Sequence, residues 1–490
     1  MIKPEDQDIR NKIFELQKTA IRLEPDSRER ASWNNQVVSY ADDFLDQIEQ
    51  LKAYVETEDQ GVGILNRTIK EDATDLNELL VDVKKYIDRP GLNPASGGHL
   101  GYIPGGGVFP TALGDYLADI TNRYAGIFFG GPGAVRMENL LIRWMCDIVG
   151  YPKNALGNLT SGGSIANLIA IATARDTKGI RSKDVENSVI YLTQQAHHSV
   201  QKAIRIAGLN EAILSYIPLD DRFRMNVHAL KKNIEKDVAE GRRPFLVIAS
   251  AGTTDTGAID PLDAIAIIAK EHDLWYHIDA AYGGFFILTE EIKNEFKGIE
   301  KSDSITIDPH KGLFLSYGTG AILIKDVEAL KKTHYYMAGY MQDAVKINAE
   351  PSPADLSPEL TKHFRGMRMW LSLQLFGLKP FRACLSEKLW LCRYFYEEIQ
   401  KIGFEVGPYP ELSVMIYRYV PKELDANEFN AKIVEGVRLD GRVFVSSTTL
   451  NEVYWIRLVV LSFRTRLSTI DLCLEILKKQ VDILEKVNIE

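Results

Sequence analysis

The chain has 490 residues, of which 45% are hydrophobic and 26% are charged, and its formal net charge at pH 7 is −9. This length exceeds what one hydrophobic core usually supports, so we expect two or three domains, and the near-average composition excludes a disordered chain or a fibrous repeat. The acidic net charge argues against a nucleic-acid-binding surface, which needs a basic stripe, and favours small-molecule partners.

The N-terminal sequence MIKPEDQDIR has no positively charged segment followed by an apolar one, so it does not resemble a secretory signal. No run approaches the ~18 apolar residues of a membrane-spanning helix. The cysteines lack metal-ligand spacing and have apolar neighbours, which predicts buried thiols at Cys146, Cys384, Cys392 and Cys473. We therefore expect a cytoplasmic protein that binds neither a membrane nor a metal ion.

Residues 5 to about 60 have the period of amphipathic helices. Ile9, Ile13 and Leu16 fall on one helical face. A second helical face contains Val37, Ala41, Phe44, Ile48 and Leu51. Two such helices cannot bury their apolar stripes alone, so they must pack on the main body or on a second subunit. We favour the second subunit and therefore predict a homodimer.

From about residue 90 to 375, short apolar strands alternate with helices. The predicted strands are 188–193, 212–219, 244–252, 275–283, 304–308 and 319–326. The predicted helices between them include 164–179, 198–208 and 261–273. This alternation indicates an α/β domain with a mostly parallel sheet covered on both faces, whose ligand binds beyond the carboxyl ends of the strands.

After about residue 376 the pattern changes to that of a smaller α+β domain. It has predicted helices at 386–403 and 468–487 and predicted strands near 413–420 and 453–461. The expected organisation is therefore an N-terminal helical dimerisation segment, a large ligand-binding domain and a small C-terminal domain, at residues 1–88, 89–375 and 376–490.

A Ser/Gly turn opens the helix predicted at 164–179. Ser161, Gly162, Gly163 and Ser164 would present backbone N–H groups at the positive end of this helix, and two hydroxyls add donors, which suits a phosphate group. The alternative is an ordinary serine N-cap. The turn lacks the GK[ST] ending of a nucleotide P-loop.

His197 and His198 directly follow the strand predicted at 188–193. A histidine there can face the ligand, offer a flat ring for stacking and donate a proton, and the alternative is a structural histidine. No second metal ligand stands at a familiar spacing, so a zinc site is not expected.

Two further strands end in polar residues. Asp279 ends an apolar strand, and because an unpaired buried carboxylate is costly, it should meet a cation or a strong donor. The strand predicted at 244–252 is followed by the hydroxyls of Thr253, Thr254 and Thr256.

The segment DPHKG, residues 308–312, places a histidine and a lysine back to back. We interpret the flanking Ser304–Ile307 and Leu313–Leu315 as apolar strand ends. A lysine in such a turn is often a solvated surface residue. If its neighbours bury it, Lys311 can instead act as a nucleophile or carry a Schiff base, because burial disfavours its charged form.

These features would lie at one edge of one sheet and together match one ligand. Pyridoxal 5′-phosphate (PLP) has a phosphate to bind, an aldehyde for a lysine, a ring for stacking, and a pyridine nitrogen whose protonated form an aspartate stabilises. We therefore expect PLP as the cofactor.

The segments TSGGSIAN, QQAHHSVQKA, AGTTDTGAIDPL, HIDAAYGG and DPHKG resemble, in this order, those of the PLP-dependent group II amino-acid decarboxylases, especially the aromatic-L-amino-acid decarboxylases. The resemblance runs from about residue 90 to 375 and more weakly to both ends. It implies the PLP-dependent transferase fold (aspartate aminotransferase-like, fold type I), with a seven-stranded, mostly parallel sheet in the large domain.

The resemblance also implies residue roles. Lys311 would form the Schiff base with PLP, Asp279 would pair with the pyridinium nitrogen, and His197 would stack on the ring. The other implied cofactor contacts are Gly163, Ser164, Thr254, Asp308 and His310, and His310 would also border the substrate carboxylate. Asp308 stands where many members have Asn, and an anion beside a phosphate must contribute through its backbone or be protonated, so its role is open.

In the family, a tyrosine on a mobile loop returns a proton to the substrate. Residues 333–360 resemble that loop, with Tyr340 at the best-matching position and Tyr335 and Tyr336 as rivals. The alternative for each of them is an ordinary surface aromatic residue.

Residues 97–126 resemble the family's substrate-pocket segment. They imply substrate contacts at Tyr102, Ile103, Pro104 and Gly105, across a dimer interface. Gly105 and Gly126 are smaller than the residues usual in the family, which suggests a roomier pocket.

The implied activity is decarboxylation of an L-amino acid to an amine and CO2, with an aromatic substrate (Trp, Tyr, DOPA or Phe) favoured. The alternatives are an acidic or diamino substrate, a PLP-dependent retro-aldol lyase of the sphingosine-phosphate type, and a non-catalytic PLP-binding homologue. Glutamate would require an extra cation in the pocket. Arg457 either binds a carboxylate or forms a structural ion pair.

Overall fold

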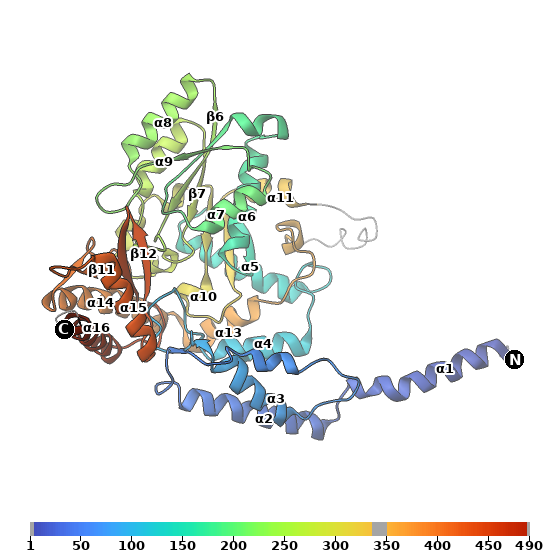
Figure 1. The fold of residues 1–490 in the computed structure, drawn as a ribbon. Coiled ribbons are helices and arrows are strands. Elements are labelled where there is room, and N and C mark those ends of the chain that lie inside the picture. The colour runs from blue at the N-terminus through green and yellow to red at the C-terminus, as the bar shows by residue number, and fades with distance from the viewer. Residues whose placement is uncertain (1–3, 336–349, 488–490) are drawn as a thin grey trace. The chain divides into compact units, whose positions relative to one another are not determined.

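The computed structural model describes residues 4–335 and 350–487 (Figure 1). The chain divides into two compact units, Met1–Leu51 with Val55–Asn93, and Lys52–Tyr54 with Pro94–Glu490. The short strands β1 (Tyr54–Val55) and β2 (Gly91–Leu92) lie near the boundaries between the units in the sequence. The division into three functional domains remains a prediction.

The first unit is helical. It contains α1 (Pro4–Ala20), α2 (Ser27–Asp46) and α3 (Leu76–Asp82), followed by a π-helical segment at Val83–Asp88. The two predicted amphipathic helices are therefore present, but the second ends at Asp46 and does not continue to residue 60. Helix α2 begins where the Asp26 carboxylate accepts hydrogen bonds from two backbone N–H groups at 2.8 and 2.9 Å.

A seven-stranded sheet forms the centre of the second unit, in the order β3-β9-β8-β7-β6-β4-β5. Its strands are β3 (Leu156–Thr160), β4 (Ser188–Leu192), β5 (Ile213–Tyr216), β6 (Arg243–Ser250), β7 (Trp275–Asp279), β8 (Ser304–Ile307) and β9 (Gly320–Ile324). Of these described strands, only β9 runs against the others. The mostly parallel seven-stranded sheet is as expected; five of its strands lie in the predicted ranges, and β6 begins one residue before its predicted range.

Strand β3 has no counterpart among those ranges. Its centre is Gly157-Asn158, which has low β-propensity. Asn158 is nevertheless fully buried, because its amide donates to the Pro353 carbonyl at 2.9 Å and accepts from the Lys362 ammonium at 2.8 Å. Contacts with distant residues therefore stabilise this strand.

Helices cover both faces of the sheet, with α8 and α9 on one side of β6 and β7 and α6 and α7 on the other (Figure 1). The helices of this region are α4 (Pro110–Thr121), α5 (Pro132–Ile148), α6 (Gly163–Thr177), α7 (His198–Ile206), α8 (Val227–Ala239), α9 (Leu262–Glu271), α10 (Pro309–Gly312), α11 (Val327–His334) and α13 (Gly366–Phe376). Because both faces are covered, the strands are apolar along their length; Val189 to Leu192 of β4 are completely buried.

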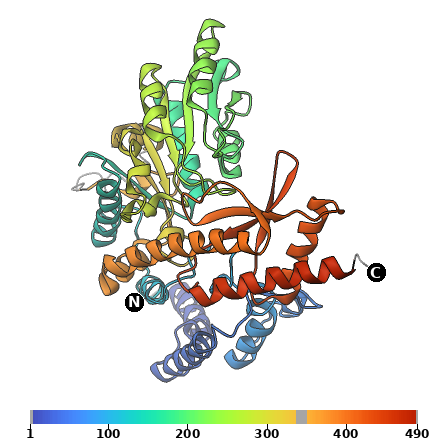
Figure 2. The same cartoon turned by 90° about the vertical axis from the view of Figure 1, so that its left-hand side faces the viewer.

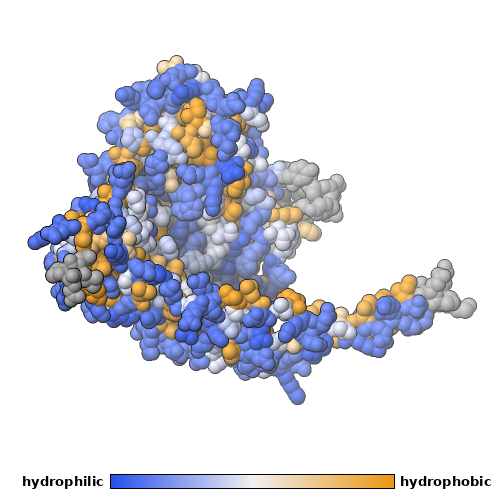
Figure 3. Space-filling view, in the orientation of Figure 1, coloured by the Kyte–Doolittle hydropathy of each residue, from blue (hydrophilic) through white to orange (hydrophobic). Residues whose placement is uncertain are grey.

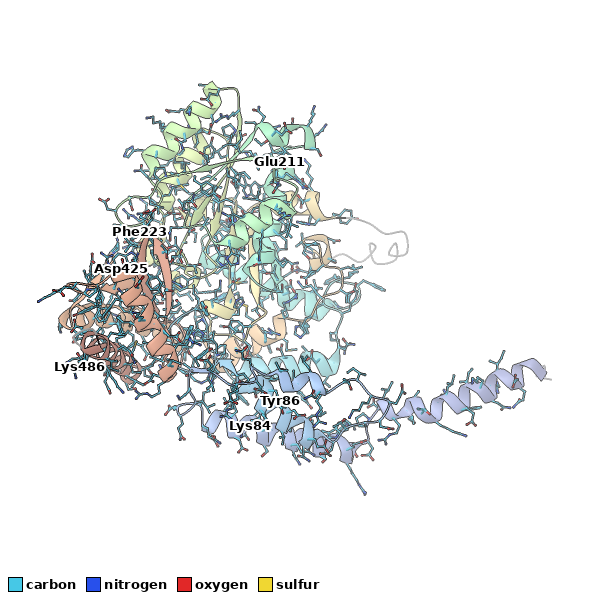
Figure 4. The ribbon with its side chains drawn as sticks, viewed as in Figure 1. Lys84, Tyr86, Glu211, Phe223, Asp425 and Lys486 are labelled. Atoms are coloured by element: carbon cyan, nitrogen blue, oxygen red, sulfur yellow. The ribbon has the colours of Figure 1, made fainter. Side chains whose placement is uncertain are left out.

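The C-terminal residues form a second, antiparallel sheet in the order β10-β11-β13-β12. Its strands are β10 (Phe404–Val406), β11 (Val414–Tyr419), β12 (Ser446–Leu450) and β13 (Val453–Val459), and the helices are α14 (Leu378–Lys401), α15 (Ala426–Asp440) and α16 (Leu467–Val487). Figure 2 shows α14 and α16 side by side, in orange and red. Asp425, labelled in Figure 4, caps α15 by accepting a hydrogen bond from the Glu428 N–H at 2.8 Å.

One local prediction is wrong. Leu313–Leu315 is not a strand end, because the chain after β8 forms the single helical turn α10, with Pro309 in its first turn. Phe314 then has a left-handed backbone, with φ of 57°, which is incompatible with an extended strand. Lys311 therefore lies on a short, fixed helix.

Cys146, Cys392 and Cys473 are buried, as predicted, and Cys384 is partly buried; all four are free thiols. Among the described residues, no helix combines the length and the apolar character that crossing a bilayer requires.

Candidate active site

A polar cavity of about 350 Å³ lies at the carboxyl ends of the parallel strands. The chain reaches it at the ends of β3, β4, β6, β7 and β8, so five segments that are distant in sequence converge there. The residues that line it are Ser161, Gly162, Gly163, Ser164, Asn167, Gln195, His197, Ser199, Ser250, Gly252, Thr253, Thr254, Asp279, Ala281, Tyr282, Asp308, His310 and Lys311. They include all eight residues for which the resemblance implied cofactor contact.

The predicted Ser/Gly turn forms one wall of the cavity, at the N-terminus of α6. A Cβ on Gly163 would lie 3.0 Å from Asp308 Oδ2 and 3.3 Å from the Ala281 Cβ. Glycine therefore keeps the backbone N–H groups of the helix N-terminus accessible from the cavity. A helix N-terminus of this kind favours an anionic group.

Lys311 lies on α10 and lines the same cavity. Its Nζ is 3.0 Å from Asp308 Oδ2, and its side chain is 22% exposed. Asp308 is almost completely buried, and its Oδ1 has no hydrogen-bond partner among the described residues. The cavity thus contains a lysine amine, an ion-paired carboxylate and an unused acceptor.

His310 contacts this ion pair from the side. Its Nδ1 lies 2.7 Å from the Thr319 carbonyl oxygen, to which it donates, and its Nε2 is 3.7 Å from Asp308 Oδ2. Burial lowers the pKa of His310 below its usual value. The imidazole is therefore neutral at pH 7 and presents Nε2 toward the carboxylate.

Asp279 ends β7 and is held by two donors. Its Oδ2 accepts from the Asn167 side-chain amide at 2.9 Å, and its Oδ1 accepts from the Ala281 backbone N–H at 3.1 Å. The sequence predicted that this buried carboxylate would meet a cation or a strong donor, and among the described residues its direct partners are these two N–H donors. Both oxygens are thereby oriented while the carboxylate borders the cavity.

The two adjacent histidines have different positions. His197 caps α7 and lines the cavity, whereas His198 is exposed and absent from the cavity wall. The Nδ1 of His197 is 2.7 Å from Ser199 Oγ, and burial lowers its pKa. Only the first histidine of the pair can therefore face a ligand in this cavity.

Thr254 lines the cavity from the turn after β6, and Arg457 on β13 fixes that turn. The Arg457 guanidinium donates to the backbone carbonyl groups of Thr254 and Asp255, the latter at 3.2 Å, and to Ser446 Oγ at 2.9 Å. Of the two alternatives for Arg457, the structure supports a structural role, although through carbonyl groups more than through an ion pair.

Of the predicted substrate residues, His310 lines this cavity, whereas residues 102–105 do not within the described chain. Tyr102 is exposed, with its ring near His99 and Phe444. Pro104 and Gly105 are buried outside the cavity wall, and Ile103 is partly buried.

Backbone atoms occupy the space beside both small glycines within this chain. A Cβ on Gly105 would lie 2.3 Å from the His310 carbonyl oxygen, and a Cβ on Gly126 would lie 2.1 Å from the Leu360 carbonyl oxygen. The expectation of a roomier pocket, in a segment expected to contact the substrate across a dimer interface, stays a prediction.

Among the loop tyrosines, Tyr335 is 51% exposed at the end of α11 and does not line the cavity. Tyr336 and Tyr340 lie outside the described residues.

Sequence reasoning assigned no role to Asn167, Ser199, Gln195 or Tyr282, which also line the cavity. For Asn167 a signal was present. It stands four residues after Gly163, so it lies on the same face of α6 one turn later, where a polar residue among apolar neighbours is unusual.

The donor set fits PLP. The α6 N-terminus and its serines can hold the phosphate, Lys311 can bind the aldehyde, Asp279 can accept from the ring nitrogen, and His197 offers a flat ring. The unpartnered Asp308 Oδ1 marks a polar position beside the phosphate end. The cavity volume lies in the range of small-molecule sites.

Comparison with known proteins gives an independent result. The profile of the pyridoxal-dependent decarboxylase conserved domain matches residues 59–420. The aromatic-L-amino-acid decarboxylase of Bacillus atrophaeus is 34% identical over 431 residues, which cover 87% of this chain and 89% of that protein. The L-2,4-diaminobutyrate decarboxylase of Acinetobacter baumannii is 30% identical over 373 residues, covering 71% of this chain and 73% of that one.

A solved structure has the same fold. The crystal structure of Oryza sativa TDC with PLP and tryptamine superposes with a TM-score of 0.88, covering 94% of this chain and 99% of that one, at 21% sequence identity. The similarity confirms the expected PLP-dependent transferase fold.

Proposed function

This chain belongs to the pyridoxal-dependent decarboxylase family, and from that premise we propose that its substrate is an aromatic L-amino acid, namely Trp, Tyr, DOPA or Phe. The coarser activity follows from the family: the protein is a PLP-dependent carboxy-lyase that converts an amino acid to an amine and CO2. PLP, when bound, withdraws the electrons that remain on the α-carbon when CO2 leaves.

The residue roles are part of this proposal. Lys311 holds the cofactor covalently, Asp279 accepts from the ring nitrogen and His197 stacks on the ring. Gly163, Ser164 and Thr254 bind the polar substituents of the cofactor, with Asp308 and His310 beside them. Their convergence on one cavity supports these assignments.

The observation that carries the aromatic assignment is the similarity to the Bacillus atrophaeus enzyme over most of both chains. The charges of the cavity agree with it. Within the described part of the chain, Lys311 is the only lysine or arginine in the cavity wall, and covalent attachment of PLP would use it. A glutamate side chain would then find no cation in the described wall of this cavity.

A diamino substrate is the second candidate, because of the relative in Acinetobacter baumannii. An ammonium on the substrate side chain would require a free carboxylate, and Asp279 and Asp308 are the carboxylates in the described cavity wall. Both already have proposed cofactor contacts, so the aromatic substrate is preferred.

The decisive experiment is product analysis by mass spectrometry. Purified, PLP-loaded protein receives L-Trp, L-Tyr, L-DOPA, L-Phe, L-Glu and L-2,4-diaminobutyrate separately, with Lys311→Ala as the inactive control. Formation of an aromatic amine by wild type alone supports the proposal. Amine formation only from glutamate or diaminobutyrate would replace the substrate class, and no amine from any substrate would favour a lyase or non-catalytic function.

We also propose Tyr340 as the residue that returns the proton to the α-carbon, on the basis of the sequence resemblance. Tyr340→Phe should lower the amine yield and increase oxidative by-products, because the α-carbon of the substrate would then lack its proton donor. Tyr335→Phe and Tyr336→Phe are the matched controls. An unchanged amine yield in Tyr340→Phe would assign the proton to another group.

A homodimer is the proposed assembly. Apolar side chains along α1 are exposed, including Ile9 at 59%, Phe14 at 60% and Leu16 at 60%. Figure 3 shows the corresponding apolar surface along this helix. Trp33, Val37 and Val38 of α2 are also more than 40% exposed. Contiguous exposed apolar stripes of this kind usually mark a protein interface, and a second copy of the chain is the partner consistent with the family.

The dimer can be tested by light scattering after size-exclusion chromatography. Ile13→Glu and Val37→Glu should shift the protein toward monomer, because each places a charge in the apolar stripe. Gln17→Glu adds the same charge at an exposed polar position of α1 and should leave the mass unchanged. A wild-type monomer would contradict the proposal.

A reducing, cytoplasmic location is proposed from the four free cysteines, because thiols persist unpaired in such a compartment.

A further inference from the structure

A chain of buried side chains leads from Trp275 to Asp279, and its last member, Asn167, also lines the cavity. Trp275 Nε1 donates to Ser304 Oγ at 2.8 Å, and Ser304 Oγ lies 2.8 Å from His277 Nδ1. The other ring nitrogen, His277 Nε2, lies 3.0 Å from Asn167 Oδ1, and the amide nitrogen of Asn167 donates to Asp279 at 2.9 Å. Ser304, His277 and Asn167 are completely buried.

The hydrogen-bond directions in this chain follow from Asp279 and from a neutral His277. An ionised Asp279 can only accept, so Asn167 must present its NH2 group there and its Oδ1 to His277. Because that oxygen can only accept, His277 carries its proton on Nε2 and its Nδ1 is an acceptor. Ser304 Oγ then donates to Nδ1 while it accepts from the Trp275 indole N–H, which can only donate.

His277 fits this arrangement because it is neutral. Burial lowers its pKa from 6.5 to about 4, so the ring has one donor and one acceptor nitrogen at pH 7. If the Asn167 amide were reversed, its oxygen would face the Asp279 carboxylate and its NH2 group would face the His277 donor. The contact between the amide oxygen and the carboxylate would then be repulsive in a buried site, where such a mismatch is costly.

Asn167 uses its full hydrogen-bonding capacity. Its oxygen also accepts from Thr306 Oγ1 at 2.6 Å, and its second N–H donates to Ser199 Oγ at 3.1 Å. Ser199 in turn contacts His197 Nδ1 through its hydroxyl at 2.7 Å and its backbone N–H at 3.3 Å. Because that N–H donates, His197 Nδ1 is an acceptor and the ring proton lies on Nε2. One amide is therefore connected to both Asp279 and His197.

We propose that Asn167 and His277 are positioning residues that orient the Asp279 carboxylate toward the ring nitrogen of PLP, with Ser304, itself bonded to Trp275, holding the other ring nitrogen of His277. The proposal depends on PLP and on the assignment of Asp279, and it is independent of which amino acid is the substrate. Asn167 and His277 do not react; they determine how well Asp279 stabilises the protonated ring nitrogen.

The test compares two ligands that differ only at that nitrogen. The full-length protein, stripped of cofactor, is titrated with PLP and with the PLP analogue in which carbon replaces the ring nitrogen, and binding is followed by absorbance. The measured quantity is the ratio of the two Kd values, PLP over analogue. Loss of packing weakens the binding of both ligands and leaves the ratio unchanged. Loss of the Asp279 orientation weakens the binding of PLP selectively and raises the ratio.

We expect Asn167→Leu and His277→Leu to raise this ratio about tenfold, in the same direction as Asp279→Asn. His277→Gln keeps an amide N–H that can donate to Asn167 and should stay within about twofold of wild type. Ser199→Ala breaks the branch to His197 and should also leave the ratio within about twofold, even if both affinities fall.

An unchanged ratio in both leucine variants, with a raised ratio in Asp279→Asn, would overturn the proposal. Equal increases in His277→Leu and His277→Gln would also overturn it, because donor direction would then be irrelevant. If Asn167→Leu does not fold, the pair of His277 variants decides. Because no substrate is used, a raised ratio would support the proposal even if the aromatic substrate class proved wrong.

Discussion

Lys311 Nζ lies 3.0 Å from Asp308 Oδ2, so the residue proposed to hold PLP forms an ion pair with the carboxylate three positions before it. The same carboxylate faces the Gly163 backbone at the N-terminus of α6, where the phosphate is expected to bind. Asp308 thus lies between the Lys311 amine and the expected phosphate site.

Asp308→Asn should increase the affinity for PLP about tenfold. The substitution removes an anion beside the phosphate and releases the Lys311 amine from its ion pair. It breaks no hydrogen bond at Asp308 Oδ1, because this atom has no partner among the described residues. Absorbance titration gives the Kd. Pyridoxal, which lacks the phosphate, is the control ligand, and its affinity should increase less than that of PLP. An equal increase for both ligands would assign the effect to Lys311 alone. Weaker binding of PLP would contradict the prediction.

Gly105→Ala should reduce covalent attachment of PLP to Lys311. The new Cβ would lie 2.3 Å from the His310 carbonyl oxygen and 3.1 Å from that of Lys311, so the segment carrying the lysine must move. Borohydride reduction followed by peptide mass spectrometry measures the attached fraction. Gly133→Ala is the matched control, because a Cβ on Gly133 would have no neighbouring atom within 4 Å. An equal attached fraction in the two variants would show that the segment carrying Lys311 can move without losing PLP attachment.

Arg457→Lys should destabilise the protein by about 2 kcal/mol and weaken PLP binding, because a lysine cannot reach two carbonyl groups and Ser446 at once. The Thr254 turn would lose its link to β13. Urea denaturation and PLP titration measure the two effects. Arg442→Lys, at a half-exposed ion pair with Asp440, should change stability by less than about 1 kcal/mol, and a similar loss in both variants would contradict a specific role for Arg457.

His277 should make the protein less stable in acid. Burial lowers the pKa of His277 from 6.5 to about 4, so between these values the unfolded chain binds a proton that the folded one does not. The neutral, buried His277 makes its full contribution to the free energy of unfolding above pH 6.5, and this contribution is lost as the pH falls toward 4. The loss amounts to roughly 3 kcal/mol for a shift of this size.

The thermal unfolding midpoint at pH 7.5 and pH 5 tests this behaviour. The decrease on acidification should be smaller in His277→Gln than in wild type. Asp260 provides the opposite control, because burial raises its pKa to about 6. Its protonation therefore favours the folded state as the pH falls. Asp260→Asn should enlarge the decrease in the unfolding midpoint between pH 7.5 and pH 5. Identical decreases in all three proteins would exclude both groups as the source.

The general plan of the protein could be predicted from local sequence. Apolar runs such as 188–193 and 275–283 indicated strands, the helical segments between them indicated a parallel sheet, and polar residues at strand ends indicated where the ligand binds. Asp279 and Lys311 were identifiable because each follows a buried strand, and this signal requires only neighbouring residues. The substrate class could not be predicted in this way, because pocket shape depends on segments that are distant in sequence.

Only the tertiary structure determined how the site is supported. The pairing of β7 with β8 places His277 opposite Ser304, and the fold brings His277 against Asn167 on α6, 110 residues earlier in the chain. Arg457 meets the Thr254 turn across 203 residues, and Gly105 meets His310 through backbone atoms. Periodicity and propensity act over a few residues, whereas these contacts depend on strand order and register, so the sequence determined which groups end the strands and the fold determined which groups hold them in place.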